Sequence, residues 1–489
     1  MSAEISIKKA TLINACAKYS NVLFMLVANA VLARLLSAEE YGILAIITVF
    51  VTFFQLFSDM GFSSGVIQNK ELTGEDISNI FSFTLYFGVV LGFLFFILSF
   101  FIAQIYQNKV FVPIGAFLSI AIFFSTANMI PSAQLMRDKQ FIVAATRSIA
   151  VNIVSYVIAI ILAFHNFSFY SLVAQSVIAA ILNFCWNYST TKIGFKVVFE
   201  IKSIRKIFSY SAYNFLYEFV NYFGRNLDNL LTGKYMGSQT LGYYNKAYQL
   251  MLYPVNYLTN VITPVLHPIL SDYQDNKEYI YKMYLKVLKC LSLLGVFASV
   301  ICTFCAEEIV LILYGSKWID TIPCIMVLGA SVWFQMITAT CTSIFKSLGE
   351  SKLRFNSGLL YAGIQILMVI GGVASGNIVV LSGYVAASFV LRFFIEHYFL
   401  IHNAFGKSQR SFYKKLLPEL LMAMILSIAM KGLNSVIKIN NCILSFTIKV
   451  SVCFIIYIGL IIATGQQKYI LPLLPQKIRG RLPFHRMEQ

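Results

Sequence analysis

Long apolar stretches separated by short polar breaks follow one another along nearly the whole chain. A helix needs about 20 mostly apolar residues to cross the hydrocarbon core of a bilayer. Stretches of that kind lie at residues 11–35, 41–67, 79–103, 110–130, 143–163, 170–190, 208–232, 242–270, 283–306, 321–345, 355–375, 378–402, 416–437 and 443–463. The pattern predicts an all-α, polytopic membrane protein with about fourteen transmembrane helices.

The composition excludes an ordinary soluble protein. Of the 489 residues, 58% are hydrophobic and 12% are charged, whereas soluble domains are roughly 45–50% apolar and about 25% charged. The nine cysteines lie mostly in apolar stretches, so no disulfide framework is expected. Cys302 and Cys305 have the spacing of a metal-binding pair, but no second pair accompanies them, and we expect no metal site.

The basic residues are distributed unevenly between the predicted loops. Lys and Arg number 38 against 21 Asp and Glu, a net charge of +17. If the N-terminus is cytoplasmic, 27 of the 38, Arg147 and Lys289 included, lie on the cytoplasmic side, 6 lie outside and 5 lie within spans. Because cytoplasmic loops carry an excess of Lys and Arg, both termini are predicted to be cytoplasmic. The net charge then needs no nucleic-acid partner, and none is expected.

An internal repeat appears when the sequence is shifted by 200 residues. The segment 34–42 aligns with 234–242, and Asn14, Lys18 and Asn21 align with Asn214, Glu218 and Asn221. Spans 1–6 and 7–12 therefore resemble two lobes in the same orientation. The expected domains are an N-terminal six-helix lobe (1–191), a basic interfacial linker (192–207), a C-terminal six-helix lobe (208–402), helices 13 and 14 (403–465) and a basic cytoplasmic tail (466–489).

The linker between the lobes alternates cations with bulky apolar residues. Its cations are Lys192, Lys196, Lys202, Arg205 and Lys206. Such a segment is expected to lie on the anionic inner leaflet and to act as a hinge. A merely solvated linker is the alternative, but the apolar half argues against it.

A polar stripe marks the seventh span. Its residues are Asn214, Glu218, Asn221, Arg225, Asp228 and Thr232, spaced 4, 3, 4, 3 and 4 positions apart on one helix face. Because a charge at the bilayer centre costs at least about 2.5–3.5 kcal/mol, this face must meet protein or a wet cavity.

Polar residues on three other spans could share that cavity. The first span carries Asn14, Lys18 and Asn21, the second carries Thr48, Thr52, Gln55 and Asp59, and the eighth carries Asn245, Gln249, Asn256, Asn260 and Thr263. Gly61 follows Asp59 and is expected to loosen the second helix near the inner side.

Two interpretations of the stripe remain open. Arg225 and Asp228 could simply pair with each other at i and i+3. Alternatively, the stripe could serve a transported substrate, since transporters hold substrate at the seam between repeats. The cavity residues would then be Lys18, Asn21, Asn221, Arg225, Lys246, Asn256 and Asn260, with the cations facing an anionic substrate, and Asp59, Glu218 and Asp228 would pair with them or bind a coupling ion.

Two further intramembrane charges have simpler interpretations. Arg392 and Glu396, at i and i+4, are expected to pair with each other. Lys449 in the last span could extend outward to the membrane surface or line a groove. The sequence contains no phosphate-binding loop, dinucleotide fingerprint or nucleophile elbow, so no catalytic residue or cofactor is expected.

Two regions carry a family resemblance. Leu-Ala-Arg-Leu-Leu-Ser-Ala-Glu-Glu-Tyr-Gly-Ile-Leu-Ala at 32–45 and Leu-Phe-Ser-Asp-Met-Gly-Phe-Ser-Ser at 56–64 resemble the opening of Wzx-type polysaccharide (O-antigen) flippases. Asn-Leu-Asp-Asn-Leu-Leu-Thr-Gly-Lys-Tyr-Met-Gly at 226–237, with 241–248 after it, resembles the same family. These proteins belong to the multidrug/oligosaccharidyl-lipid/polysaccharide (MOP) exporter superfamily.

The resemblance implies two six-helix lobes around a central cavity that opens alternately to either side. Its implied substrate is an undecaprenyl-pyrophosphate-linked oligosaccharide, moved from the inner to the outer leaflet of the bacterial plasma membrane for assembly of lipopolysaccharide, O-antigen or exopolysaccharide. Implied partners are this substrate, membrane lipids, and polysaccharide polymerase and chain-length proteins. Lys18, Arg225 and Lys246 are the positions that could meet the pyrophosphate, while Glu218 and Asp228 make the cavity mixed in charge.

Two other functions compete with a flippase. A cation-coupled multidrug or small-solute antiporter of the same superfamily would use a similar layout. A membrane polymerase or lipid-dependent glycosyltransferase typically needs a sizeable external loop with catalytic residues, whereas the longest predicted here, 307–320, is short. The chain is therefore predicted not to be an enzyme.

Overall fold

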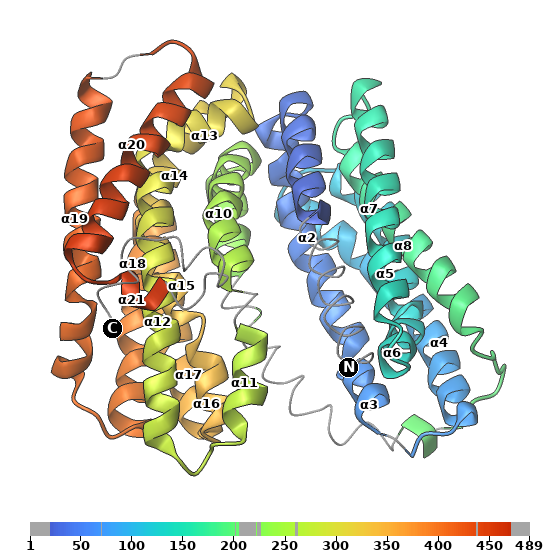
Figure 1. Cartoon of the computed structure of the whole chain (residues 1–489). Helices are drawn as coiled ribbons and strands as arrows, with labels where there is room; N and C mark the ends of the chain where they lie inside the picture. Colours follow the sequence, from blue (N-terminus) through green and yellow to red (C-terminus); the bar gives the residue numbers. More distant parts are fainter. Residues whose placement is uncertain are drawn as a thin grey trace. The chain divides into compact units, whose positions relative to one another are not determined.

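A computed structural model describes residues 20–69, 71–200, 202–204, 222, 226–259, 263–436 and 439–470. Every regular element in these ranges is a helix, which confirms the all-α class (Figure 1). The chain forms two compact units, Met1–Gly242 and Tyr243–Gln489. The domain boundaries expected from the repeat stay a prediction.

The first unit is a bundle of long and short helices. In order they are Ser20–Leu35, α2 (Ala38–Asp59), α3 (Phe62–Gln68), α4 (Gly74–Ile105), α5 (Phe111–Ala127), α6 (Met129–Arg137), α7 (Phe141–Phe164), α8 (Tyr170–Thr191) and residues 226–235. Two capping boxes fix helix starts, with Ser37 and Glu40 at α2 and with Thr73 and Asp76 at α4.

The second unit begins within α10 (Ser238–Thr259), whose first turn belongs to the first unit. After it come α11 (Thr263–Ser271), α12 (Lys277–Phe304), α13 (Ala306–Leu313), η1 (Ser316–Thr321), α14 (Ile322–Gly329), α15 (Val332–Thr338), α16 (Cys341–Ser347), α17 (Ser351–Ala374), α18 (Ile378–His397), η2 (Tyr398–Ala404), α19 (Gln409–Val436), α20 (Cys442–Ala463) and α21 (Gln467–Ile470). The predicted loop 307–320 is therefore largely helical, because α13 and η1 occupy it.

Within the described ranges, nine helices are long and apolar enough to cross a membrane, or ten if the bent pair Ser316–Gly329 and Val332–Ser347 counts as one span. The remaining predicted spans correspond to shorter or more polar helices, namely Ser20–Leu35, α8, 226–235 and α10. The count of fourteen crossings stays a prediction. Large apolar side chains such as Val89, Phe93 and Leu367 are more than half exposed, as lipid-facing residues of a multi-pass membrane protein are.

The linker residues that the structure describes pack on the first unit. Ile193 and Ile204 are buried in a core formed with α3, α4 and α6. Lys196 pairs with Glu75 at 2.5 Å, and Ser203 Oγ donates a hydrogen bond to Asp76 Oδ1 at 2.7 Å. Ile193 and Ile204 thus contact protein, whereas Phe195, Val197 and Val198 are exposed. The position of the linker on the inner leaflet stays a prediction.

Candidate functional site

Half of the ten predicted site residues lie where the structure can be described. Asn21, Asp59 and Asp228 belong to the first unit, and Lys246 and Asn256 belong to the second. The other five, Lys18, Glu218, Asn221, Arg225 and Asn260, lie outside the described residues. The stripe as a whole therefore stays a prediction, and the described polar groups have to be considered individually.

A break in the second predicted span creates a polar pocket. α2 ends at Asp59, Met60 and Gly61 adopt left-handed conformations (φ 34° and 81°), and α3 begins at Phe62. This confirms the loosening expected at Gly61. The pocket, of about 370 Å³, lies between α2–α3 and α5–α6 and is lined by Gln55, Ser58, Asp59, Ser63, Asn128 and Ser132, among others. We call it the α2/α3 pocket.

Hydrogen bonds across the break hold the pocket in shape. Asp59 Oδ1 accepts from the backbone N–H of Ser63 at 3.3 Å, which ties the exposed carboxylate to the first turn of α3. Buried Ser58 and Thr126 share a hydrogen bond of 2.6 Å that joins α2 to α5. Asp59 therefore presents a negative charge to a pocket whose other lining groups include hydroxyls and amides.

A chain of amides connects this pocket to a cation on α7. Asn128, which lines the pocket, accepts a hydrogen bond of 2.7 Å from fully buried Asn187 on α8. Arg147 Nη1 donates a hydrogen bond to Oδ1 of the same Asn187 amide. The Nε atom of Arg147 is buried and has no partner in the described part of the chain. A guanidinium is thus linked to the pocket through two amides.

Sequence reasoning missed Arg147 as a site residue because it was counted among the cytoplasmic cations. Its place inside the predicted span 143–163 was the signal that could have identified it. Lys289 was misplaced in the same way, because it lies buried within α12. In each case a polar partner on a neighbouring helix compensates the cost of removing the charge from water. The partner is Asn187 for half-buried Arg147 and Glu419 for buried Lys289.

Asn21 is engaged by its own unit. Its Oδ1 accepts from Asn152 Nδ2 at 3.2 Å, and Asn29 on the same helix donates to Tyr156 at 3.3 Å. The helix Ser20–Leu35 is therefore joined to α7 by two amide contacts, which lie about two turns apart on Ser20–Leu35 and about one turn apart on α7. A substrate that used Asn21 would have to share or replace its bond with Asn152.

The last two residues of the predicted stripe are buried. Asp228 and Thr232 are 4% and 0% exposed, as expected of polar groups that cannot face lipid. Asp228 Oδ1 accepts from the backbone N–H of Asn229 at 2.8 Å. Tyr106 at the end of α4 donates to the carbonyl of Leu230 at 3.1 Å. This helix is thus anchored within the first unit.

Lys246 is enclosed by aromatic rings in the second unit. Its side chain is 1% exposed, and Nζ lies 5.1 Å from the centre of the Tyr314 ring and 5.9 Å from that of Trp318. Such contacts stabilise a cation away from water. Asn256, in contrast, is exposed on the same helix. The role expected for Lys246 toward an anionic substrate stays a prediction.

The repeated segments meet in a close contact. A methyl group on Gly42 of α2 would lie 1.7 Å from the carbonyl oxygen of Ser238, and one on Gly242 would lie 1.8 Å from that of Ala38. All four residues belong to the first unit. The two helices therefore approach with backbone against backbone, which only glycine at both points allows.

The family of the chain follows from a comparison of its sequence. A family model described as "Polysaccharide biosynthesis protein" matches residues 31–323. The chain belongs to this family. That range contains α2 through η1, and so includes the α2/α3 pocket, Arg147 and the paired glycines.

Individual relatives of the chain carry related names. It is 23% identical over 384 residues to the teichuronic acid biosynthesis protein TuaB of Bacillus subtilis, a match that covers 78% of this chain and 79% of the relative. It is 22% identical to the lipopolysaccharide biosynthesis protein WzxC of Escherichia coli (83% and 85% covered) and 22% identical to the succinoglycan biosynthesis transport protein ExoT of Rhizobium meliloti (71% and 70%).

Solved structures share the fold. The lipid II flippase MurJ in an inward closed conformation matches 92% of this chain and 98% of its own with a TM-score of 0.74 at 16% identity. An inward-facing multidrug resistance MATE transporter of the MOP superfamily matches 77% and 94% with a TM-score of 0.60 at 13% identity. These likenesses show the fold that this polysaccharide biosynthesis protein shares with MurJ and the MATE transporter. The resemblance to the polysaccharide flippase family is confirmed by the family model and the named relatives, and the apolar helices make the chain a multi-pass membrane protein.

Proposed function

We propose that this polysaccharide biosynthesis protein is a flippase for an undecaprenyl-pyrophosphate-linked oligosaccharide repeat unit. It moves the unit from the inner to the outer leaflet of the bacterial plasma membrane, with both of its termini cytoplasmic, and supplies the enzymes that assemble a surface polysaccharide. Polysaccharide polymerase and chain-length proteins are its expected partners. The chain itself performs no covalent chemistry.

The observation that carries this proposal is the polar path inside the first unit. Asp59 and Asn128 line a pocket within a helical unit whose surface is rich in exposed apolar side chains, and Asn187 links that pocket to Arg147. A lipid-linked sugar needs hydroxyl-binding groups for its head and a cation for its pyrophosphate, because neither part can enter hydrocarbon alone. Arg147 is thus a further cation for the set proposed from the sequence, Lys18, Arg225 and Lys246.

Alternating access is proposed from two features. MurJ, a named lipid II flippase, and the MATE transporter share this fold, and members of such folds move one half against the other around a fixed site. The reciprocal glycine contact holds the start of α10 against α2 within the first unit, so this stretch is proposed to move with that unit. The driving force for movement would act through carboxylates such as Asp59, Glu218 and Asp228.

Transport of labelled undecaprenyl-pyrophosphate oligosaccharide tests the proposal. In sealed proteoliposomes, an external glycosidase that cannot cross the membrane should gain access to the inner-leaflet pool only when the protein is present. Protection that is unchanged by the protein would contradict a flippase.

A cation-coupled multidrug or small-solute antiporter is the second candidate, because the fold also matches a MATE transporter. The same proteoliposomes, given an imposed sodium or proton gradient, would then accumulate or release a cationic dye while the labelled lipid stayed protected.

A further inference from the structure

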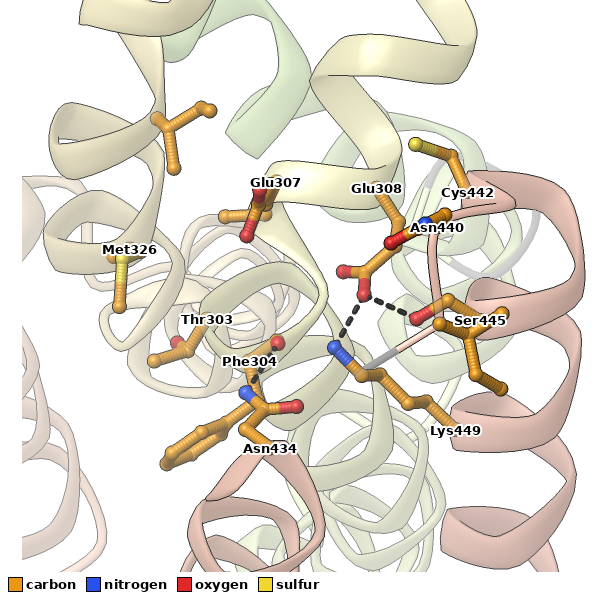
Figure 2. Close-up of a pocket in the computed structure, with 13 residues that line it drawn as sticks. Thr303, Phe304, Glu307, Glu308, Met326, Asn434, Asn440, Cys442, Ser445 and Lys449 are labelled. Carbon is orange, nitrogen blue, oxygen red and sulfur yellow. Dashed lines mark hydrogen bonds and ion pairs between the residues drawn. The ribbon is translucent and has the colours of Figure 1, made fainter. Parts of the chain in front are cut away.

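The second unit contains a buried ion pair that the proposed transport path does not use. Glu308 on α13 and Lys449 on α20 are 5% and 6% exposed and form an ion pair through Glu308 Oε1. Ser445 Oγ donates to the same oxygen at 2.8 Å (Figure 2). Of the two outcomes left open by the sequence, Lys449 therefore lines a groove and does not extend outward to the membrane surface.

A pocket of about 360 Å³ opens beside this pair. Its walls come from the end of α12, from α13, α14 and the end of α19, from residues 439–440, and from α20 (Figure 2). We call it the α13 pocket. The topology predicted from the basic residues places the connections 307–320 and 438–442 on the outer side of the membrane, so the pocket is expected to face the outside.

Among the residues that line the α13 pocket, three side-chain oxygens are buried without a hydrogen-bond partner in the described part of the chain. They are Glu308 Oε2, Thr303 Oγ1 and Asn434 Oδ1. The Asn434 amide is oriented by its other end, since Nδ2 donates to the carbonyl of Phe304 at 3.0 Å. Buried polar atoms of this kind are normally satisfied, so the three oxygens indicate a ligand that donates hydrogen bonds to them.

The charges and size of the pocket select among ligand classes. Exposed Glu307 and buried Glu308 outnumber Lys449, which disfavours an anion. Lys449 already neutralises Glu308, and the volume far exceeds what one ion with oxygen ligands at about 2.3–2.6 Å requires, which disfavours a bound metal cation. Apolar groups of Phe304 and Met326 also form part of the wall.

A saccharide fits all of these features. Its hydroxyl groups can donate to carboxylate and amide oxygens and accept from the ammonium of Lys449, while its C–H faces pack on apolar side chains. We propose that the α13 pocket is a saccharide-binding site on the second unit. Its natural ligand would be the sugar portion of the exported repeat unit or of the growing polymer, and this assignment rests on the proposed function. Saccharide binding by the pocket does not depend on the proposed function.

Cys442 offers a direct probe, because it lines the pocket and is half-buried. The full-length protein would be placed in lipid nanodiscs and purified without alkyl-glycoside detergents, whose head groups would compete. Alkylation of Cys442 by N-ethylmaleimide would be followed by mass spectrometry, with free glucose, galactose and N-acetylglucosamine as probes. Cys185 of α8, which is exposed, is the internal reference.

At least one sugar should slow alkylation of Cys442 in a saturable way and leave Cys185 unaffected. Thr303→Val keeps the side-chain shape and removes one unpaired oxygen, so the protecting sugar should bind about fivefold more weakly. Thr447→Val, which alters a hydroxyl on the exposed side of α20 that bonds only within its own helix, should bind as the native protein does. Asn434→Leu is the second variant if Thr303→Val does not yield folded protein.

Three results would overturn the proposal: no sugar protects Cys442, glycerol protects it equally well, or sodium or potassium ions alone protect it. Failure of this site is distinguishable from failure of the flippase proposal. Saccharide protection without transport of the lipid-linked substrate leaves a binding site on a protein of another function, and transport without protection leaves a flippase whose α13 pocket binds no sugar.

Discussion

Gly42 on α2 and Gly242 on α10 occupy equivalent points of one reciprocal helix contact. Each faces the carbonyl oxygen of the residue four positions before the other, since Gly42 meets Ser238 and Gly242 meets Ala38. The two glycines are separated by the same 200 residues that relate the repeated segments 34–42 and 234–242. In the repeat, Gly42 corresponds to Gly242 and Ala38 to Ser238. The contact of Gly42 with Ser238 therefore recurs as the contact of Gly242 with Ala38, as a twofold relation between the two segments produces.

Alanine at either glycine should destabilise the protein. A methyl group there would lie within 2 Å of a backbone oxygen, so the helices must separate, and overpacking of this kind typically costs about 1–3 kcal/mol. Gly459→Ala in α20 is the matched control, because nothing lies within 4 Å of the added group and alanine favours a helix. Thermal unfolding in detergent would measure all three variants, and equal midpoints would refute the close contact.

The charged stripe of the seventh predicted span should be needed for transport. Arg225→Ala and Asp228→Ala are each expected to reduce flipping of the labelled lipid-linked oligosaccharide while the protein remains inserted and folded. The reason is that charges inside the membrane are costly in lipid and typically serve a function. Asp228 is buried and so does not face lipid. Normal flipping by both variants would mean that the two residues only fill space or satisfy each other.

How much of this structure the sequence predicts depends on how far apart along the chain the interacting residues lie. Hydrophobic runs predict the helices, because burial in lipid acts on every residue of a span. The Arg392–Glu396 pair, predicted from its spacing of four, is present at 2.6 Å, and the break at Gly61 follows from a single residue's backbone freedom. These features are local, so the sequence contains all that determines them.

Partners that are distant in sequence could not be predicted in this way. Glu308 and Lys449 are 141 positions apart, Lys289 and Glu419 are 130 apart, and Arg147 and Asn187 are 40 apart. No periodicity relates such residues, because the packing of helices brings them together only in three dimensions. The two polar pockets depend on the same packing, and the sequence indicated only Gln55, Asp59 and Lys449 from their walls.

Arg147 and Asn187 should be energetically coupled. Asn187 joins the guanidinium to Asn128, so Asn187→Leu removes a hydrogen-bond partner from each of two half-buried groups, a loss of about 1–3 kcal/mol. Combined with Arg147→Met, the leucine should cost much less than it does alone. A double-mutant cycle on thermal unfolding measures this coupling. Additive effects would show that the amide chain does not link α7 to the α2/α3 pocket.

The protein should lose more stability when one partner of the Lys289–Glu419 pair is replaced than when both are replaced. Nζ lies 2.7 and 2.9 Å from the two carboxylate oxygens, and the side chains are 6% and 0% exposed. Glu419→Leu alone leaves a buried ammonium unpaired and should cost about 3–5 kcal/mol. Lys289→Met with Glu419→Leu should recover most of this stability, as judged by the unfolding midpoint. A double variant as unstable as Glu419→Leu would contradict the importance of the pair.

Labelling of single cysteines should place the linker on the cytoplasmic side. The prediction follows from the excess of Lys and Arg there. Placing Arg147 and Lys289 within helices does not change it, because 27 basic residues were assigned to the cytoplasmic side and 6 to the outside, and removing two from the 27 leaves a large excess. With the nine native cysteines replaced, Lys202→Cys should react with an impermeant maleimide in inverted vesicles and be silent in right-side-out cells. Tyr235→Cys, 71% exposed beside the first turn of α10, should react in the opposite way. Labelling of Lys202→Cys from outside alone would reverse the orientation, and with it the side from which the lipid-linked sugar is expected to enter.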